Sequence, residues 1–144
     1  GHIVNTASVA GLISPPGMGM YNVSKHAVVA LTETLHHDLA ARTALVRCSV
    51  VCPAFFPSGI AESERARPER LASGREKTAE DRALEAGLAK AVQSGRLSAE
   101  DVANAVFEAV RDERFYVLTH PRILPSVERR MQDILEGRAP RSPV

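Results

Sequence analysis

Tyr21 and Lys25 have the types and the spacing of a pair that could do chemistry. If Tyr21 opens a helix, Lys25 lies one turn further on the same face, and its ammonium group can sit beside the phenol. A free phenol has a reference pKa of about 10, and a nearby cation favours phenolate, so such a pair can donate and accept a proton. Ser8, thirteen positions before Tyr21, can offer a hydroxyl to the same reacting oxygen. The three residues together predict a proton-transfer site.

A strand and a loop must position Ser8. Residues 2–7 form an apolar run that ends in small polar residues, which predicts a buried parallel strand. In open α/β sheets the ligand crevice lies outside the carboxyl ends of the strands, which is where Ser8 is expected. Without Tyr21, Ser8 would be interpreted as a turn residue, as Ser14 is in the Pro- and Gly-rich loop that follows.

A helix must position Tyr21 and Lys25. Apolar residues recur at helical spacing from about Tyr21 to Ala41, which predicts one long amphipathic helix. The apolar stripe consists of Val23, Ala27, Val28, Leu31, Leu35 and Leu39. The other residues, among them His36, His37 and Asp38, are expected on a solvated or interface face.

The stretch from Ser8 to Lys25 resembles the classical short-chain dehydrogenase/reductases. In that family a serine near the end of the fifth strand and a Tyr-x-x-x-Lys in the next helix form the catalytic centre, and their spacing matches Ser8, Tyr21 and Lys25. The resemblance implies an α/β fold, with this chain as the C-terminal part of a single doubly wound parallel-sheet (Rossmann-type) domain. It also implies an NAD(P)-dependent oxidoreductase that interconverts an alcohol and a carbonyl.

The same resemblance implies roles for the three residues and a set of partners. Tyr21 would donate the proton to a carbonyl oxygen, Ser8 would hold that oxygen, and Lys25 would bind the nicotinamide ribose. The substrate would be a small-molecule alcohol or carbonyl, and the residues that select NAD or NADP are expected upstream of residue 1. The long helix would pair with its neighbour across a subunit interface in a homodimer or homotetramer.

A second β-branched run, residues 45–51, predicts the next parallel strand, and a turn from Cys52 follows it. In the family the equivalent turn is usually Pro-Gly followed by a Thr that bonds the nicotinamide carboxamide. Here Ala54 replaces the Gly, and by register Ser58 replaces the Thr. The expected cofactor-binding residues are therefore Tyr21, Lys25, Pro53, Ala54, Phe56 and Ser58. A plain turn role for Ser58 and core packing for Phe56 are the alternatives.

The rest of the chain is less specific. Charged residues dominate residues 61–97, where the resemblance implies a substrate lid and composition alone equally allows a solvated helical hairpin or a partly disordered loop. Cap patterns at Thr78 and Ser98 predict two helix starts. Residues 115–119 predict a short last strand, residues 124–134 a final amphipathic helix, and residues 137–144 a frayed, flexible tail.

Composition excludes several classes of function. A net charge of +1 and the absence of Trp give no reason to expect a nucleic-acid partner. No apolar run is long enough for a membrane span, and no Cys/His cluster indicates a metal site. Cys48 and Cys52 are too far apart along one strand for a disulfide, so two buried thiols and a reducing cytoplasm are expected.

Two alternatives stay open. The sequence begins with Gly1 and contains neither G-x-G-x-x-G nor G-x-x-x-G-x-G, so a fragment is expected, which in isolation would bind no cofactor and would act only as a structural or interaction piece. Epimerases and dehydratases related to the family also use Tyr-x-x-x-Lys. Their serine typically lies further upstream than Ser8 does, which favours the dehydrogenase.

Overall fold

The computed structural model describes residues 1–42, 45–71 and 74–143. These residues form two compact units, one of Gly1–Ala54 with Val102–Val144 and one of Phe55–Asp101. The strands are β1 (His2–Thr6), β2 (Arg47–Val51) and β3 (Tyr116–Val117). The α-helices are α1 (Gly19–Arg42), α2 (Ala79–Gln93), α3 (Ala99–Arg111) and α4 (Leu124–Leu135). Short 3-10 helices are η1 (Val9–Gly11), η2 (Gly59–Ala66), η3 (Glu69–Leu71) and η4 (Pro121–Ile123).

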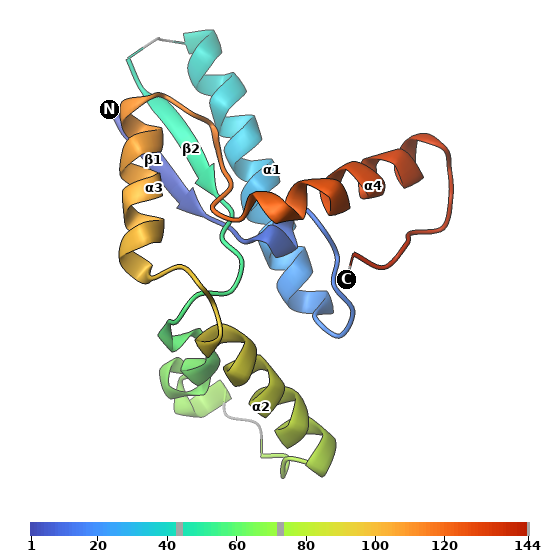
Figure 1. Cartoon of the computed structure of the whole chain (residues 1–144). Coiled ribbons are helices and arrows are strands. Elements are labelled where there is room, and N and C mark those ends of the chain that lie inside the picture. The colour runs from blue at the N-terminus through green and yellow to red at the C-terminus, as the bar shows by residue number, and fades with distance from the viewer. Residues whose placement is uncertain (43–44, 72–73, 144) are drawn as a thin grey trace. The chain divides into compact units, whose positions relative to one another are not determined.

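The first unit is built on a parallel sheet in the order β1-β2-β3, and Figure 1 shows β1 and β2 side by side. His2 lies opposite Arg47 and Thr6 opposite Val51, so the carboxyl ends of β1 and β2 are level. Tyr116 extends the sheet opposite Val50. Parallel neighbours need a crossover connection, and α1 supplies the one between β1 and β2. The predicted α/β fold with a parallel sheet is confirmed.

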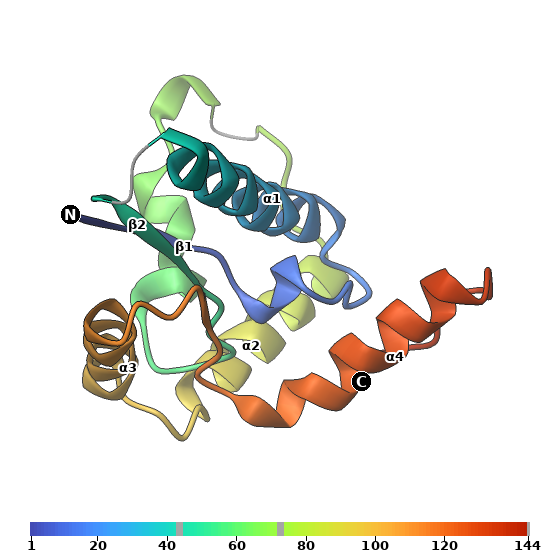
Figure 2. The same cartoon turned by 90° about the horizontal axis from the view of Figure 1, so that it is seen from above.

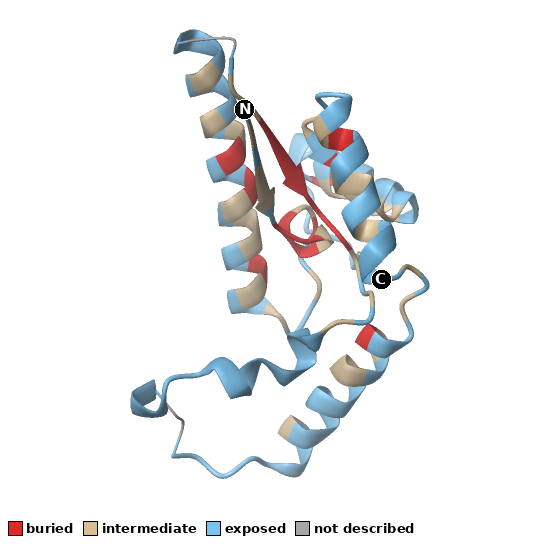
Figure 3. Cartoon of the chain, turned by 90° about the vertical axis from the view of Figure 1, so that its left-hand side faces the viewer, coloured by how far each residue is buried: buried red, intermediate tan, exposed pale blue. Residues whose placement is uncertain are grey.

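Helices cover both faces of this sheet, α1 on one side and α3 on the other (Figure 2). Successive side chains of a strand point to opposite faces. Val50 accordingly packs in a cluster with Val29 of α1, and Val51 packs in another with Ala109 of α3. Burial follows β2 along most of its length (Figure 3). A strand covered on both faces is typical of a doubly wound domain.

Helix α1 is present as predicted, but only part of the predicted apolar stripe, such as Val28, packs toward the sheet. Val23 and Leu31 are 63% and 64% exposed, whereas Asn22, Val29 and Thr32 are buried. Hydrogen bonds explain how a polar residue can face the strand. The Thr32 hydroxyl donates to the Val28 carbonyl (2.7 Å) and accepts from Asn5 Nδ2 of β1 (3.0 Å).

The second unit contains η2, η3 and α2. The predicted helix start at Thr78 is confirmed, because Thr78 and Asp81 form a reciprocal capping box. Gly95 packs closely within this unit, since a Cβ there would fall 2.6 Å from Phe56 Cα and on the carbonyl of Phe55. The lid function of residues 61–97 stays a prediction.

The C-terminal part of the chain follows the predicted element order. Ser98 and Asp101 form the expected cap of α3. Strand β3 has two residues and is shorter than the predicted strand 115–119. After α4, Arg141 donates its backbone N–H and its guanidinium to the buried carboxylate of Asp133 (3.1 and 2.8 Å). The flexibility expected of this tail stays a prediction.

Candidate active site

Ser8 lies just beyond the carboxyl end of β1, at the N-cap of η1. Its hydroxyl accepts a hydrogen bond from the Ala10 backbone N–H (3.2 Å) and lies 3.4 Å from the carbonyl of Pro53, to which it donates. The second of these bonds is long and therefore weak. The hydroxyl proton can consequently be redirected to another acceptor at little cost.

Tyr21 and Lys25 lie on α1, which begins at Gly19, so Tyr21 belongs to the first helical turn rather than opening it. The Lys25 ammonium lies 5.6 Å from the centroid of the Tyr21 ring. It also donates to the carbonyl of Thr6, the last residue of β1 (3.3 Å). A lysine has three donors, so this bond leaves others available to a ligand. The predicted proximity of phenol and ammonium is confirmed, and the same ammonium is tied to the strand that precedes Ser8.

Gly11 brings the Ser8 turn against α1, and the sequence alone did not mark it as a site residue. A Cβ on Gly11 would lie 2.6 Å from the Lys25 carbonyl oxygen and 2.9 Å from Val29 Cγ2. Only a residue without a side chain allows this approach. The signal that could have revealed it was a glycine between a candidate serine and a candidate helix.

The Pro53–Ala54 peptide joins the end of β2 to this site. The Pro53 carbonyl accepts from the Val9 N–H (3.0 Å) as well as from the Ser8 hydroxyl. On its other side the Ala54 N–H donates to His120 Nδ1 (3.1 Å). His120 was missed from the sequence, where the His-Pro pair indicated only the end of a strand.

Phe56 and Ser58, the other residues expected at the cofactor, belong to the second unit. Ser58 occupies the N-cap of η2, and its side chain makes no capping hydrogen bond there. Phe56 is partly buried, and the neighbouring Phe55 is 45% exposed. The structure thus brings Ser8, Tyr21, Lys25, Pro53 and Ala54 into one unit and leaves the roles of Phe56 and Ser58 as predictions.

Two nearby groups are held in their neutral forms. Burial raises the pKa of the Cys52 thiol to about 11, although a hydrogen bond from the Ser8 backbone acts in the opposite direction. Burial and the neighbouring Glu33 carboxylate raise the pKa of Tyr116 to about 12. The Tyr116 hydroxyl donates to Glu33 Oε1 at 2.5 Å. Neither group is suited to accept a proton near neutral pH.

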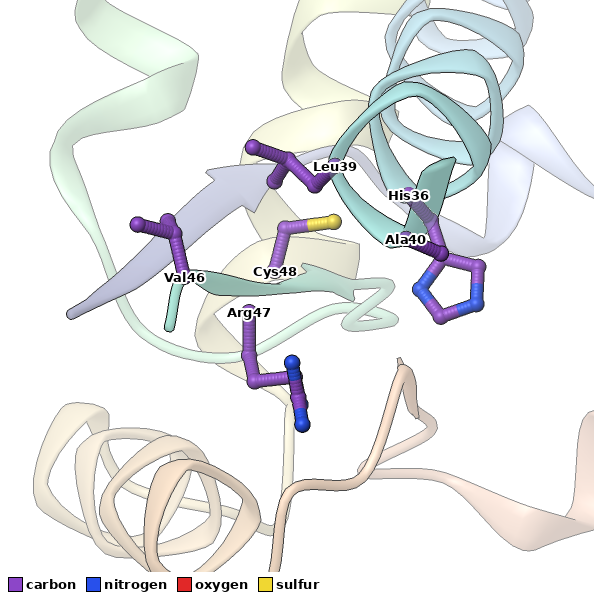
Figure 4. A pocket seen from close by; sticks show the side chains of 6 residues that line it. All are labelled: His36, Leu39, Ala40, Val46, Arg47 and Cys48. Carbon is purple, nitrogen blue, oxygen red and sulfur yellow. The ribbon is translucent and has the colours of Figure 1, made fainter. Parts of the chain in front are cut away.

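A hollow of about 230 Å³ lies at the other end of β2, between that strand and the last turns of α1. Its lining is His36, Leu39, Ala40, Val46, Arg47 and Cys48 (Figure 4).

Cys48 and Cys52 are buried free thiols, as predicted, and burial raises the pKa of Cys48 as well. Among the described residues no three His, Cys, Asp or Glu side chains are grouped to hold a metal ion. None of the described helices could span a membrane.

Comparisons with known proteins find dehydrogenases among the relatives of this chain. Residues 1–69 match the family described as short chain dehydrogenase. The chain is 35% identical over 140 residues to the CLA biosynthesis dehydrogenase/reductase of Lactiplantibacillus plantarum, covering 96% of this chain and 49% of that protein. It is 31% identical over 140 residues to the C alpha-dehydrogenase of a Sphingobium strain, covering 97% of this chain and 44% of the relative.

A solved structure is more similar still. A short chain dehydrogenase/reductase from Burkholderia phymatum, crystallised in complex with NAD, superposes with a TM-score of 0.95 and 56% identity. The match covers 99% of this chain and 51% of that one. The chain therefore spans about half the length of the relatives it matches. Residues 1–69 carry the pattern of the short chain dehydrogenase family, and the chain as a whole is related to the short-chain dehydrogenases/reductases.

Proposed function

We propose that this chain supplies the proton-transfer residues of an NAD(P)-dependent oxidoreductase that interconverts an alcohol and a carbonyl. One observation carries the proposal. The Lys25 ammonium lies beside the Tyr21 phenol and is bonded to the strand end that precedes Ser8. A proton donor, a cation and a hydroxyl at the carboxyl ends of parallel strands are what reduction of a carbonyl requires.

In the reductive direction Tyr21 gives its proton to the carbonyl oxygen. Lys25 stabilises the phenolate that forms, and the Ser8 hydroxyl turns from the Pro53 carbonyl to donate to the same oxygen. Charge that develops on the oxygen is then stabilised by the Ser8 and Tyr21 hydroxyls and by the nearby Lys25 cation. When bound, the nicotinamide cofactor supplies or receives the hydride.

The residues present fit such a cofactor. Lys25 retains donors for a ribose hydroxyl, and the Pro53–Ala54 backbone borders the same end of the sheet. Phe56 and Ser58 are proposed as further cofactor-binding residues. The chain spans about half the length of the relatives it matches, so the proposal is made for the whole protein.

The proposed partners are a small-molecule substrate and further copies of the same protein. Exposed apolar residues on α1, such as Met20, Val23 and Leu31, support a homodimer or homotetramer that buries this helix. Two buried free thiols support a reducing compartment, for which the cytoplasm is proposed.

The test is the Tyr21→Phe variant of the intact protein, assayed with NAD(H) and NADP(H) against a panel of alcohols and ketones. Turnover should fall by about 100-fold to 10,000-fold, because general acid catalysis is lost, while cofactor affinity changes little. Tyr116→Phe is the matched control, since it removes the chain's other tyrosine hydroxyl and should keep wild-type turnover. Undiminished turnover in Tyr21→Phe would refute the assignment.

A further inference from the structure

The peptide group between Pro53 and Ala54 is held at both of its ends. Its carbonyl oxygen accepts from the Val9 N–H (3.0 Å) and from the Ser8 hydroxyl (3.4 Å). Its N–H donates to Nδ1 of His120, 66 residues further along the chain (3.1 Å). Because a peptide group is planar, the contact on one side sets the direction of the carbonyl on the other.

The contacts of His120 determine which of its ring nitrogens carries the proton. A backbone N–H can only donate, so Nδ1 must present a lone pair to Ala54. The hydroxyl of Thr119 lies 2.8 Å from the same Nδ1 and must therefore donate to it as well. Two donors aimed at one nitrogen require the neutral ring with its proton on Nε2. A protonated ring would set an N–H against the Ala54 N–H.

The surroundings of His120 favour the same form. Burial lowers the pKa of His120, and no charged side chain of the described residues contributes to this shift. The groups that face Nδ1, from the turn after β2 and from the end of β3, are the Ala54 N–H and the Thr119 hydroxyl, and neither titrates near neutral pH.

We propose that His120 is a positioning residue for Ser8. It acts as a neutral imidazole acceptor that orients the Pro53–Ala54 peptide and, through the bond from the Val9 N–H to the Pro53 carbonyl, the turn that carries Ser8. The proposal rests on the function proposed above. It adds that the site depends on a side chain that bonds the backbone of Ala54 rather than Ser8, Tyr21 or Lys25. When the ring is protonated, the peptide is released, and the Pro53 carbonyl no longer fixes the Ser8 turn through the Val9 N–H.

The experiment compares His120→Asn with His120→Leu in the intact protein. Asn offers an oxygen bonded to Cγ, where histidine has Nδ1, so it can still accept from Ala54 without titrating. Leu has similar bulk and no acceptor. His37→Asn is the matched control, because His37 is exposed on α1 away from Ser8. The measurements are kcat and kcat/KM across pH 5–9, the Kd for NAD, and the thermal midpoint.

We expect His120→Leu to lower kcat by about 10-fold to 100-fold, the loss typical of a reacting group misplaced by about 1 Å. The Kd for NAD should change less than kcat does. His120→Asn should recover most of the lost turnover. It should also lack the fall in activity that the wild type shows as pH drops below the pKa of His120, and His37→Asn should keep that fall. Equal losses in the Asn and Leu variants would overturn the proposal, as would an unchanged acid limb in His120→Asn.

A second readout does not depend on turnover. In the protein labelled with ¹⁵N-histidine, the resonance absent from His120→Asn identifies His120, and its nitrogen shifts report the tautomer. The proposal expects an unprotonated Nδ1 and a protonated Nε2 at neutral pH, with the Ala54 amide shifting as the ring titrates. A proton on Nδ1 at neutral pH would overturn it. If these shifts are as expected while the wild type and Tyr21→Phe have equal activity, the proposed function has failed and the His120 contact stands.

Discussion

Replacing Gly11 with Ala tests whether the close approach of the Ser8 turn to α1 builds the site. Gly11 does not have a positive φ, so the backbone can accept alanine and the effect is one of space. The added Cβ would lie 2.6 Å from the Lys25 carbonyl oxygen, whereas ordinary contacts begin near 3.4 Å. The turn and the helix must therefore separate by roughly 0.8 Å at this point.

Neither partner can yield easily. The Lys25 carbonyl belongs to the backbone of α1, and Val29, the second contact, is 6% exposed in the core beside β2. Overpacking of this kind costs about 1–3 kcal/mol. A displacement of this size at Ser8 should also lower kcat by up to about 100-fold, since reacting groups tolerate little misplacement. The assays are equilibrium urea unfolding and steady-state turnover of the intact protein.

Gly19→Ala is the matched control, because Gly19 lies in the same unit and a Cβ there meets nothing within 4 Å. Its stability should equal or slightly exceed that of the wild type, since alanine favours helix. The reasoning about Gly11 is refuted if Gly11→Ala unfolds at the wild-type urea concentration and keeps wild-type turnover.

Three further predictions concern stability and reactivity. Thr32→Val should cost about 1–3 kcal/mol in urea unfolding, because it leaves the Asn5 amide without its acceptor against α1. Cys52, whose pKa burial raises to about 11, should resist iodoacetamide at pH 8 until the protein unfolds. Hydrogen bonds from Arg141 lower the pKa of Asp133, so its contribution to stability is complete above the unfolded value of about 3.9 and is lost as pH falls through the lower folded value. Asp133→Asn should speed hydrogen exchange at the Arg141 amide at pH 7.

Each of these has a control in the same chain. Thr34→Val removes an exposed hydroxyl that bonds only to the Ala30 carbonyl in its own helix, and should change stability by less than about 0.5 kcal/mol. A cysteine introduced by Ser63→Cys is exposed and should alkylate readily at pH 8. Glu136→Gln should leave exchange at the Arg141 amide unchanged. Each prediction is contradicted if its variant and its control do not differ: in unfolding free energy for Thr32, in alkylation rate for Cys52, and in exchange rate at the Arg141 amide for Asp133.

Features that depend on contacts between residues close in the sequence could be predicted from the sequence. The cap at Thr78 could be predicted, because both capping partners lie within four consecutive residues. The approach of Lys25 to Tyr21 followed from helical spacing alone. The parallel sheet followed from β-branched runs separated by a long helix.

Long-range contacts could not be predicted in this way. The buried side of α1 carries Asn22 and Thr32. Polar residues are normally expected on the solvent-facing side of a helix. The hydrogen bond from Asn5 of β1, which allows Thr32 to be buried, joins residues far apart in the sequence. The bond between His120 and Ala54 spans 66 residues and follows no periodic pattern. Gly11 matters through the atoms of Lys25 and Val29 that surround it, and these are visible only after the chain has folded.

The division of the chain into two units has a consequence for how such proteins can diversify. Residues Phe55–Asp101 form one continuous segment, which begins after the Pro53–Ala54 peptide and ends within the first turn of α3. The paired residues of β1 and β2, together with Ser8, Tyr21 and Lys25, all lie outside that segment. A change of length within this segment is therefore expected to leave the register of β1 against β2 as it is.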